Sequence, residues 1–220
     1  MRRLFALVVF VLLLAAMAIG AIAVRDLRRG YRSPLGARVV HFSRRRAPDV
    51  LFANGGDHSY WHNRADGPWG SYVLREAIPA ALRRSGADPH RVAIGGISMG
   101  GFGALDLARL APGRFCAVGG HSAAMWFRGA DTPAGALDDA ANFARNDVIA
   151  FAARRSLTHA PVWIDVGTKD PFCQVDTVLV GELRADGERV RFKVWPGGHE
   201  SGYWHHHIGR YLKFYADACG

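Results

Sequence analysis

The sequence predicts an α/β fold, in which helices cover both faces of a mostly parallel sheet. Half of the 220 residues are apolar, which is enough for a sizeable core. Short apolar runs typical of buried strands alternate with stretches whose apolar residues have helical spacing. The most informative junction is segment 95–101, a glycine-rich turn between the apolar run 92–94 and the amphipathic run 102–110.

The elements follow from these patterns in chain order. Strands are expected at 38–43, 50–53, 91–94, 115–119, 161–167 and 190–195. Helices are expected at 72–84, 101–110, 142–155, 176–184 and 203–218. Turn signals such as Ser85-Gly86 and Pro112-Gly113 end the helices. Segment 123–159 has a looser pattern, and we expect it to be an insertion that shapes a substrate pocket.

The turn at 95–101 contains the pattern G-x-S-x-G, formed by Gly96, Ser98 and Gly100. Between a strand and a helix this pattern is typical of a nucleophile elbow. Small residues on either side permit a tight, strained turn that raises the Ser98 hydroxyl above the sheet. The first amides of the following helix then face the atom that the hydroxyl attacks. The alternative is a glycine-rich connection without chemistry.

A serine nucleophile needs a base, and the base needs an acid that fixes its tautomer. Asp170 follows the strand expected at 161–167, and His199 follows the strand expected at 190–195. The order serine, acid, histidine, with each residue after a strand, is that of a catalytic triad. Taken alone, Asp170 fits an ordinary turn before a proline, and His199 fits an exposed loop. Asp165 and Asp176 are worse placed, inside a strand and a helix.

Other residues give weaker signals. Residues 205–207 are consecutive histidines, which a helix directs about 100° apart, so they cannot bind one ion together. His58 and His62 lie in a loop without a cysteine or an acid pair. We predict no metal and no cofactor. The aromatic residues either line a pocket or pack in the core; they are Trp61, Trp69, Trp126 and Phe127.

The net charge and the number of cysteines limit the classes of partner and the disulfides that we expect. The formal charge is +9, and 25 of the 28 basic residues are arginines spread along the chain. We attribute this first to genomic bias, then to attraction to an anionic membrane. No basic helix, aromatic RNA-binding motif or zinc-finger spacing occurs, so we expect no nucleic-acid partner. Cys116, Cys173 and Cys219 are odd in number and predict no disulfide framework, and Cys173 is expected to be a buried thiol.

The amino terminus carries an apolar run at 4–24, which is long enough to cross a bilayer as a helix. Ala21-Ile22-Ala23 resembles a signal-peptide cleavage site. We therefore expect an N-terminal hydrophobic helix at 1–24, acting as a signal peptide or membrane anchor. A linker with a possible first strand follows at 25–48, and the catalytic domain at 49–220. Arginines are denser after the run than before it, which argues against export.

The chain resembles the esterase D-type branch of the α/β-hydrolases, which includes S-formylglutathione hydrolases, feruloyl and acetyl-xylan esterases and mycolyltransferases. The resemblance covers about residues 49–218. It depends on four segments: Asn54-Gly55-Gly56, 69–79 (beginning Trp69-Gly70-Ser71-Tyr72), the elbow and Gly197-Gly198-His199. It implies an α/β-hydrolase-like fold, with Ser98 as nucleophile, Asp170 as acid and His199 as base. It also implies the Met99 amide as an oxyanion donor. Candidate pocket residues are Gly55, Gly56 and Trp126.

The chain departs from that pattern at one place. Members of this branch carry an apolar strand that ends in a His-Gly loop, before the strand matching 50–53. The loop supplies the second oxyanion amide. No His-Gly occurs between residue 24 and Val50, so the sheet is expected to be shortened on its amino-terminal side. Either 39–42 replaces that strand or the central strand is missing. Loss of one oxyanion donor costs about 10²–10³ in rate.

The sequence therefore predicts a serine esterase that cleaves carboxylic esters through an acyl-enzyme. Its substrate would be a small-molecule, lipid or polysaccharide ester. We expect it to be secreted or membrane-anchored, outside the cytoplasm of a bacterium, with membrane contact through the N-terminal helix. One alternative is an acyltransferase of the mycolyltransferase type. The other is a catalytically inactive, membrane-tethered hydrolase-like domain.

Overall fold

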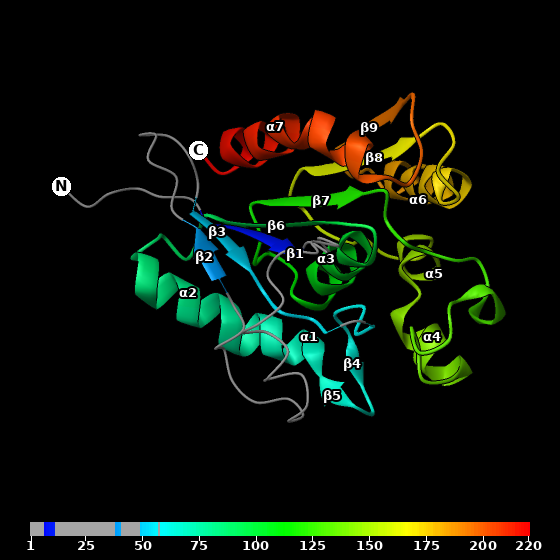
Figure 1. The fold of residues 1–220 in the computed structure, drawn as a ribbon, viewed down its shortest axis with the longest axis horizontal. Coiled ribbons are helices and arrows are strands. Elements are labelled where there is room, and N and C mark those ends of the chain that lie inside the picture. The colour runs from blue at the N-terminus through cyan, green and yellow to red at the C-terminus, as the bar shows by residue number, and fades with distance from the viewer. Residues whose placement is uncertain (1–6, 12–37, 41–48, 57) are drawn as a thin grey trace.

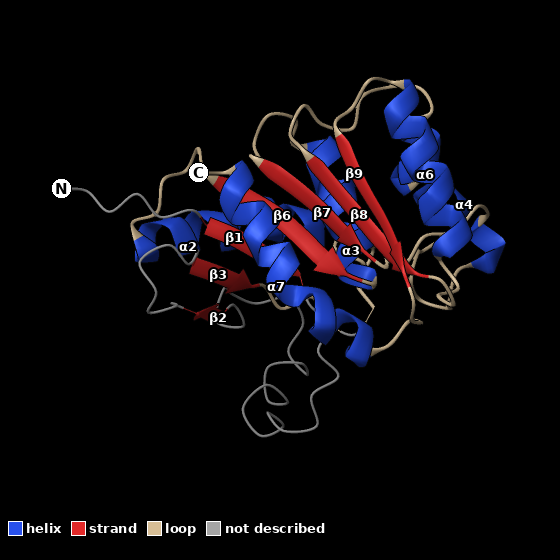
Figure 2. Ribbon diagram, turned by 90° about the horizontal axis from the view of Figure 1, so that it is seen from above, coloured by secondary structure: helices blue, strands red, loops and turns tan. Residues whose placement is uncertain are grey.

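The computed structural model describes residues 7–11, 38–40, 49–56 and 58–220, and a seven-stranded sheet forms its centre (Figures 1 and 2). The strand order is β2-β3-β1-β6-β7-β8-β9. The strands are β1 (Leu7–Val11), β2 (Arg38–Val40), β3 (Asp49–Phe52), β6 (Val92–Ile97), β7 (Ala117–His121), β8 (Val162–Gly167) and β9 (Val190–Trp195). Only β2, at one edge, is antiparallel to its neighbour. The predicted α/β class is confirmed.

Helices and a small hairpin complete the described fold. The helical segments are α1 (Trp69–Tyr72), η3 (Val73–Ala77), α2 (Ile78–Ser85), α3 (Met99–Leu110), η4 (Gly129–Asp131), α4 (Ala140–Asn146), α5 (Val148–Ala152), α6 (Cys173–Ala185) and α7 (Ser201–Ala218). The hairpin consists of β4 (Asn63–Arg64) and β5 (Gly67–Pro68). Gly86 ends α2 with φ +68° and donates its amide to the carbonyl of Leu82, as a left-handed helix cap does.

Side chains of the buried strands alternate between two cores, as the pleat of a strand requires. Val92 and Ile94 lie in the larger core, with residues of α2, α3 and α6. Ala93, between them, lies in the smaller core, which α7 covers. Figure 1 shows α7 on the opposite side of the sheet from α2 and α3. Helices packed on both faces hold the sheet in place, and the loops at the carboxyl ends of its strands contain the predicted site residues.

The interior strand β1 consists of Leu7–Val11, which we expected to lie in an N-terminal hydrophobic helix. It is parallel to both neighbours, and Leu7 pairs with Asp49 of β3 and Val92 of β6. The sheet is therefore not shortened at this position, and β2 does not replace the central strand, because it pairs with β3 at the edge. Buried parallel strands and membrane helices are both continuous apolar runs, and for this reason the sequence pattern led us to predict a helix here.

The rest of the predicted leader, 1–6 and 12–24, lies outside the described residues, so a signal peptide or anchor stays a prediction. Among the helices that the structure describes, none has the length and apolar character needed to span a bilayer.

In the insertion after β7, two helices, α4 and α5, stand where we predicted one at 142–155. The break falls at Asp147, whose extended backbone (φ −74°, ψ 95°) interrupts the helix. The Asp147 side chain then caps the second helix by accepting the Ala150 amide at 2.9 Å. Asp139 caps α4 in the same way, through the Asn142 amide at 2.6 Å. Aspartate favours such capping over the interior of a helix, and this was the overlooked signal.

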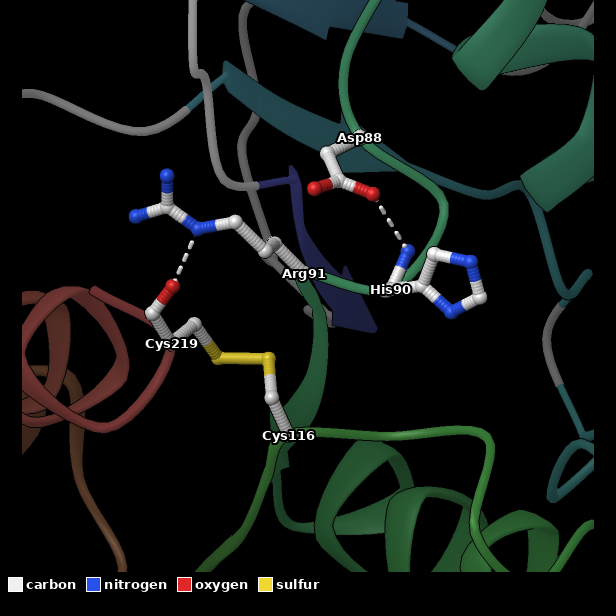
Figure 3. Close-up of a disulfide and its surroundings, with 5 residues drawn as sticks. All are labelled: Asp88, His90, Arg91, Cys116 and Cys219. Atoms are coloured by element: carbon white, nitrogen blue, oxygen red, sulfur yellow. Dashed lines mark hydrogen bonds between the residues drawn. A yellow bond between two sulfur atoms is a disulfide. The ribbon is translucent and has the colours of Figure 1, made fainter.

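A disulfide joins Cys116, just before β7, to Cys219, just after α7 (Figure 3). The two Cα atoms are 5.3 Å apart, although 103 residues separate the cysteines in sequence. Our expectation that the cysteines form no disulfide framework was therefore wrong for this pair. Closing a loop of that length stabilises a fold by roughly 2–5 kcal/mol. Arg91 donates to the Cys219 carbonyl beside the bond. Cys173 is free and partly exposed, not buried as expected.

Candidate active site

Ser98 lies at the turn between β6 and α3, with φ +56° and ψ −121°. A residue with a side chain rarely adopts this conformation, so surrounding contacts must hold it. Two contacts with the end of β7 and the loop after it do so: the Ser98 amide donates to the His121 carbonyl at 2.9 Å, and the Ser98 carbonyl accepts the Ala124 amide at 3.0 Å. The strained turn leaves the Ser98 side chain partly exposed at the carboxyl edge of the sheet.

The structure brings the three predicted residues together. His199 Nε2 lies 2.8 Å from Ser98 Oγ, and His199 Nδ1 lies 2.9 Å from Asp170 Oδ2. In the neutral ring, Nδ1–H donates to the carboxylate, and Nε2 accepts from the hydroxyl. The histidine side chain is 24 % exposed, whereas that of Asp170 is completely buried. The base can thus reach a substrate while its acid is shielded from water.

Asp170 and His199 meet because the loops after β8 and β9 touch. The Lys169 amide donates to the Gly197 carbonyl at 2.8 Å. A Cβ at Gly167 would lie 2.5 Å from that carbonyl oxygen, and Gly197 itself has φ +143°. Both positions therefore require glycine, one for close approach and one for its backbone conformation. These glycines place the acid and the base at hydrogen-bond distance.

The surroundings of Asp170 favour its charged form. Burial alone would raise the pKa of this carboxyl, but hydrogen bonds from the His199 ring, the Phe172 amide and the Ser122 hydroxyl lower it below its usual value. The Phe172 amide donates to Oδ1 at 2.9 Å, so both carboxylate oxygens are engaged. An ionised Asp170 can stabilise the imidazolium that forms when His199 takes a proton.

Asp165, one of the two competing acids, lies on the α7 side of the sheet. Its Oδ1 contacts His121 Nδ1 at 2.5 Å, and its Oδ2 accepts the hydroxyls of Tyr203 and Tyr211 at 3.0 and 2.8 Å. His121 Nε2 in turn contacts the Tyr215 hydroxyl at 2.7 Å. This buried network attaches three tyrosines of α7 to β7 and β8. It therefore holds the helix that begins two residues after His199.

Asp176, the other competing acid, is buried at the start of α6. Its Oδ2 accepts the Ala123 amide at 3.2 Å, whereas its Oδ1 has no hydrogen-bond partner among the described residues. Burial raises the pKa of Asp176 well above its usual value, and the nearby charges of Asp170 and Asp165 add to the effect. Such surroundings favour the protonated form of the Asp176 carboxyl.

The raised pKa of Asp176 has a stability consequence. In the unfolded chain this carboxyl ionises near pH 4, so above that pH the unfolded state binds fewer protons than the folded state. The free energy of unfolding of the wild type should therefore fall as pH rises from about 4 toward the folded-state pKa. Asp176→Asn removes this penalty and keeps an acceptor for the Ala123 amide. We expect the variant to gain stability relative to the wild type with increasing pH.

Urea unfolding of both proteins between pH 4 and 8 measures this difference. Asp186→Asn, a change at the exposed carboxyl end of α6, is the control and should follow the wild type. A stability difference that stays constant across this pH range would show that Asp176 is ionised in the folded protein.

The proposed oxyanion donor, the Met99 amide, is the first of α3. The first amides of a helix have no partner within it, and the Ser98 carbonyl accepts from the amides of Gly101 and Phe102 farther along, as well as from Ala124. Val11, at the carboxyl end of β1, pairs with Gly96, so β1 ends beside the elbow. The chain that follows it, 12–37, lies outside the described residues, and the second donor stays unassigned.

Of the candidate pocket residues, Trp126 lies in a line of aromatic rings that ends at the base. Its ring centroid is 5.5 Å from that of Phe172, which is 5.1 Å from the ring of His199. Gly55 is buried beneath Trp61, since a Cβ there would lie 2.4 Å from the indole. Gly56 lies beside Trp69. A pocket role for these glycines stays a prediction.

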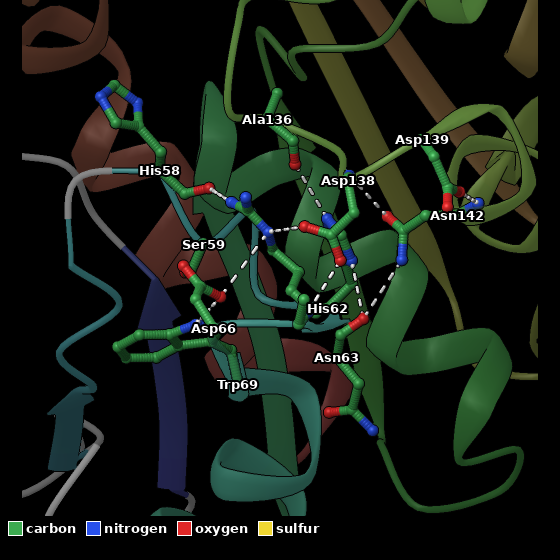
Figure 4. A network of polar contacts seen from close by, with 12 residues as sticks. His58, Ser59, His62, Asn63, Asp66, Trp69, Ala136, Asp138, Asp139 and Asn142 are labelled. Atoms are coloured by element: carbon green, nitrogen blue, oxygen red, sulfur yellow. Dashed lines mark hydrogen bonds and ion pairs between the residues drawn. The ribbon is translucent and has the colours of Figure 1, made fainter. Parts of the chain in front are cut away.

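The aromatic loop at 58–69 is tied to the insertion by a polar network (Figure 4). The His62 ring is buried and contacts the Ala136 carbonyl at 3.0 Å. The Arg64 guanidinium and the Ala65 amide both donate to Asp138, at 3.1 and 2.8 Å. His62 is thus engaged with backbone, and no group of histidines, cysteines and acids in the described ranges is arranged to hold a metal.

Three residues around the site were not singled out from the sequence. Trp204 and Phe172 flank the His199 ring, with centroids at 5.0 and 5.1 Å. Ser122 directly follows β7, and its hydroxyl accepts a hydrogen bond from Trp204 Nε1 at 3.1 Å. The available signal was position: each stands within five residues of a strand end or triad member at the edge that carries the site. Aromatic and hydroxyl residues are too common for that position to be decisive.

Comparisons with known proteins identify the family and the fold. A family model described as "Putative esterase" matches residues 52–215. A ferulic acid esterase structure has a TM-score of 0.74 at 17 % identity, covering 99 % of this chain and 87 % of its own. An S-formylglutathione hydrolase from Agrobacterium tumefaciens has a TM-score of 0.70 at 19 % sequence identity. The match covers 99 % of this chain and 86 % of the hydrolase. Mycobacterium tuberculosis MPT51 has a TM-score of 0.66 at 16 % sequence identity. The match covers 98 % of this chain and 91 % of MPT51. No curated protein sequence matches.

Proposed function

Because the chain belongs to this esterase family and is therefore a carboxylic ester hydrolase, we propose that it cleaves esters through an acyl-enzyme formed on Ser98. The observation that carries the proposal is the hydrogen-bond chain from Ser98 to His199 to Asp170, at 2.8 and 2.9 Å, on a strained strand-to-helix turn. These are the parts that nucleophilic acyl transfer requires, in positions where they can act together.

In the proposed reaction, His199 Nε2 takes the Ser98 proton while the hydroxyl oxygen attacks the ester carbonyl. Asp170 stabilises the imidazolium, and the Met99 amide donates to the oxyanion. The tetrahedral intermediate collapses, and the alcohol leaves with the proton from His199. Water, deprotonated by the same ring, then attacks the acyl-enzyme, and the acid is released with Ser98 restored.

A serine-directed fluorophosphonate probe and p-nitrophenyl acetate and butyrate test this proposal on the full chain. We expect stoichiometric labelling, located at Ser98 by peptide mass spectrometry, and a burst of p-nitrophenol equal to the enzyme concentration when deacylation is slow. Ser98→Ala should lose both, whereas Ser201→Ala, at the exposed start of α7, should retain both. A folded wild type with neither labelling nor turnover would favour the inactive hydrolase-like domain.

The same assay separates hydrolysis from acyl transfer. With an alcohol acceptor such as butanol or glycerol, a hydrolase releases mainly the free acid. An acyltransferase of the mycolyltransferase type releases mainly the new ester. The described residues contain no feature that favours transfer, so we propose hydrolysis of a small-molecule ester as the main reaction.

We also propose that the protein functions outside the cytoplasm, either secreted or membrane-anchored. The disulfide between Cys116 and Cys219 supports this, because such bonds persist in oxidising compartments and are rare in a reducing cytosol. Anchoring through the N-terminal segment stays a prediction. Thiol labelling before and after reduction, on protein isolated from the native host, tests whether the bond forms there.

A further inference from the structure

An apolar hollow lies between α3 and the insertion after β7. It has about 230 Å³ of space in all, the open part at its mouth included. This is less than the roughly 300–1,000 Å³ that holds a whole drug-sized ligand, so the hollow suits one part of a substrate. Its walls come from α3, the loop after β7, and the two helices α4 and α5 with the chain that leads to them.

The lining of this hollow is mainly apolar. Seven of its nine lining residues have apolar side chains, and the two polar ones are engaged within the protein. The Asn146 side chain donates to the Asn142 carbonyl at 2.8 Å and accepts from Arg109 at 3.4 Å. Asp147 caps α5 by accepting the Ala150 amide at 2.9 Å. The hollow therefore fits an uncharged, apolar group better than a polar one.

Two residues of the wall are close to the nucleophile. Phe102 donates its backbone amide to the Ser98 carbonyl at 3.1 Å, and side chains of a helix lean toward its amino end. Ala124 donates to the same carbonyl at 3.0 Å, and the next residue, Met125, also lines the hollow. A group bound to Ser98 Oγ thus has about one helical turn, roughly 5 Å, to cover before it reaches this wall.

The base borders the same wall through a row of aromatic rings. Trp126 lines the hollow, and its ring stands edge-on to that of Phe172, with centroids 5.5 Å apart. Phe172 is in turn 5.1 Å from the His199 ring. Tyr60 lies 5.6 Å from Trp126, with a backbone φ of +47° that residues with a side chain seldom adopt. Such strain is typical of functional sites, and these rings connect the hollow to the triad.

We propose that this hollow binds the acyl group of the ester and selects straight, uncharged chains longer than acetyl. The inference rests on the proposed function and names its substrate class. The acyl carbon is the atom that becomes bonded to Ser98 Oγ, so the acyl chain starts beside Phe102 and Met125. Each methylene that leaves water for the hollow should raise kcat/KM about fourfold.

The test compares kcat/KM for p-nitrophenyl acetate and butyrate, which share one leaving group. The two added methylenes should raise the wild-type value about 16-fold. Ile149→Trp fills the hollow from α5, where the side chain is partly exposed, and should abolish this preference. A ratio of two substrates on one protein does not depend on how much of the enzyme is folded. Leu137→Trp fills the hollow from another segment and decides if Ile149→Trp does not fold.

Phe127→Ala is the matched control. Phe127 follows Trp126 in the chain, but it is 49 % exposed and lies outside the residues that line the hollow. The control should keep the wild-type ratio of butyrate to acetate. A wild type that prefers acetate, or filled variants that keep the wild-type preference, would overturn the proposal.

Methyl and butyl butyrate, which differ only in the alcohol, complete the experiment. If the filled variants change this ratio and leave the acyl ratio unchanged, the hollow holds the alcohol and the proposal is wrong. A wild type that hydrolyses no ester overturns the proposed function itself. Turnover with an unchanged acyl ratio overturns only the assignment of the hollow.

Discussion

Asp170→Asn is expected to lower kcat for ester hydrolysis about 10⁴-fold. The reason lies in the Phe172 amide, which donates to Oδ1 at 2.9 Å. An asparagine at this position must present its carbonyl to that amide, and its NH₂ group then faces His199 Nδ1. The ring is forced to accept at Nδ1 and to carry its proton on Nε2, where it cannot take the proton of Ser98.

Stopped-assay kinetics with p-nitrophenyl butyrate measure this loss, and Ser98→Ala sets the floor. Asp131→Asn is the control, because Asp131 is an exposed carboxylate of the insertion that also pairs with a cationic side chain, Arg128. Its kcat should equal that of the wild type. A loss of less than about 100-fold for Asp170→Asn would indicate that another group orients His199, and the assignment of the acid would be wrong.

Removal of residues 1–24 is expected to abolish cooperative folding, because it deletes β1, an interior strand of the sheet. β1 pairs with β3 on one side and β6 on the other, so its loss leaves the facing edges of both strands unpaired. Val9→Pro is the milder test: it removes one amide from the middle of the sheet and should cost about 3 kcal/mol. Urea unfolding, followed by tryptophan fluorescence, measures both changes.

Val39→Pro is the matched control, since β2 is the edge strand of the described sheet, in which β3 is its one neighbour. Its cost should be smaller. The opposite outcome is informative: a fragment of residues 25–220 that unfolds cooperatively and keeps full esterase activity would show that β1 is dispensable. In that case the whole segment 1–24 would act as a leader.

The sequence predicted most of the sheet, because the pattern from β6 to α7 alternates as a parallel α/β fold requires. The prediction from the sequence failed where two different structures have the same sequence pattern. The run containing Leu7–Val11 is as apolar as a membrane helix, and only pairing with distant strands distinguishes the two. The bond between Cys116 and Cys219 likewise depends on three-dimensional proximity, which spacing along the chain does not reveal.

The candidate site was predictable to the extent that chemistry and position coincide. Ser98, Asp170 and His199 combine reactive side chains with places directly after strands, and the structure brings them within hydrogen-bond distance. Ser122 occupies an equivalent place after β7, but serine after a strand is too common to be informative. Its significance depends on Trp204, whose indole reaches it from a helix 82 residues later.

The tyrosines that attach α7 to the sheet give the protein an optical reporter. Burial raises the pKa values of Tyr203, Tyr211 and Tyr215, and the charge of Asp165 raises them further. These three of the six tyrosines should therefore stay un-ionised during an alkaline titration until α7 separates from β7 and β8. Burial also raises the pKa values of Tyr60 and Tyr72, so the part of the tyrosinate absorbance that is lost in a variant with phenylalanine at the three α7 positions would record detachment of the helix next to His199.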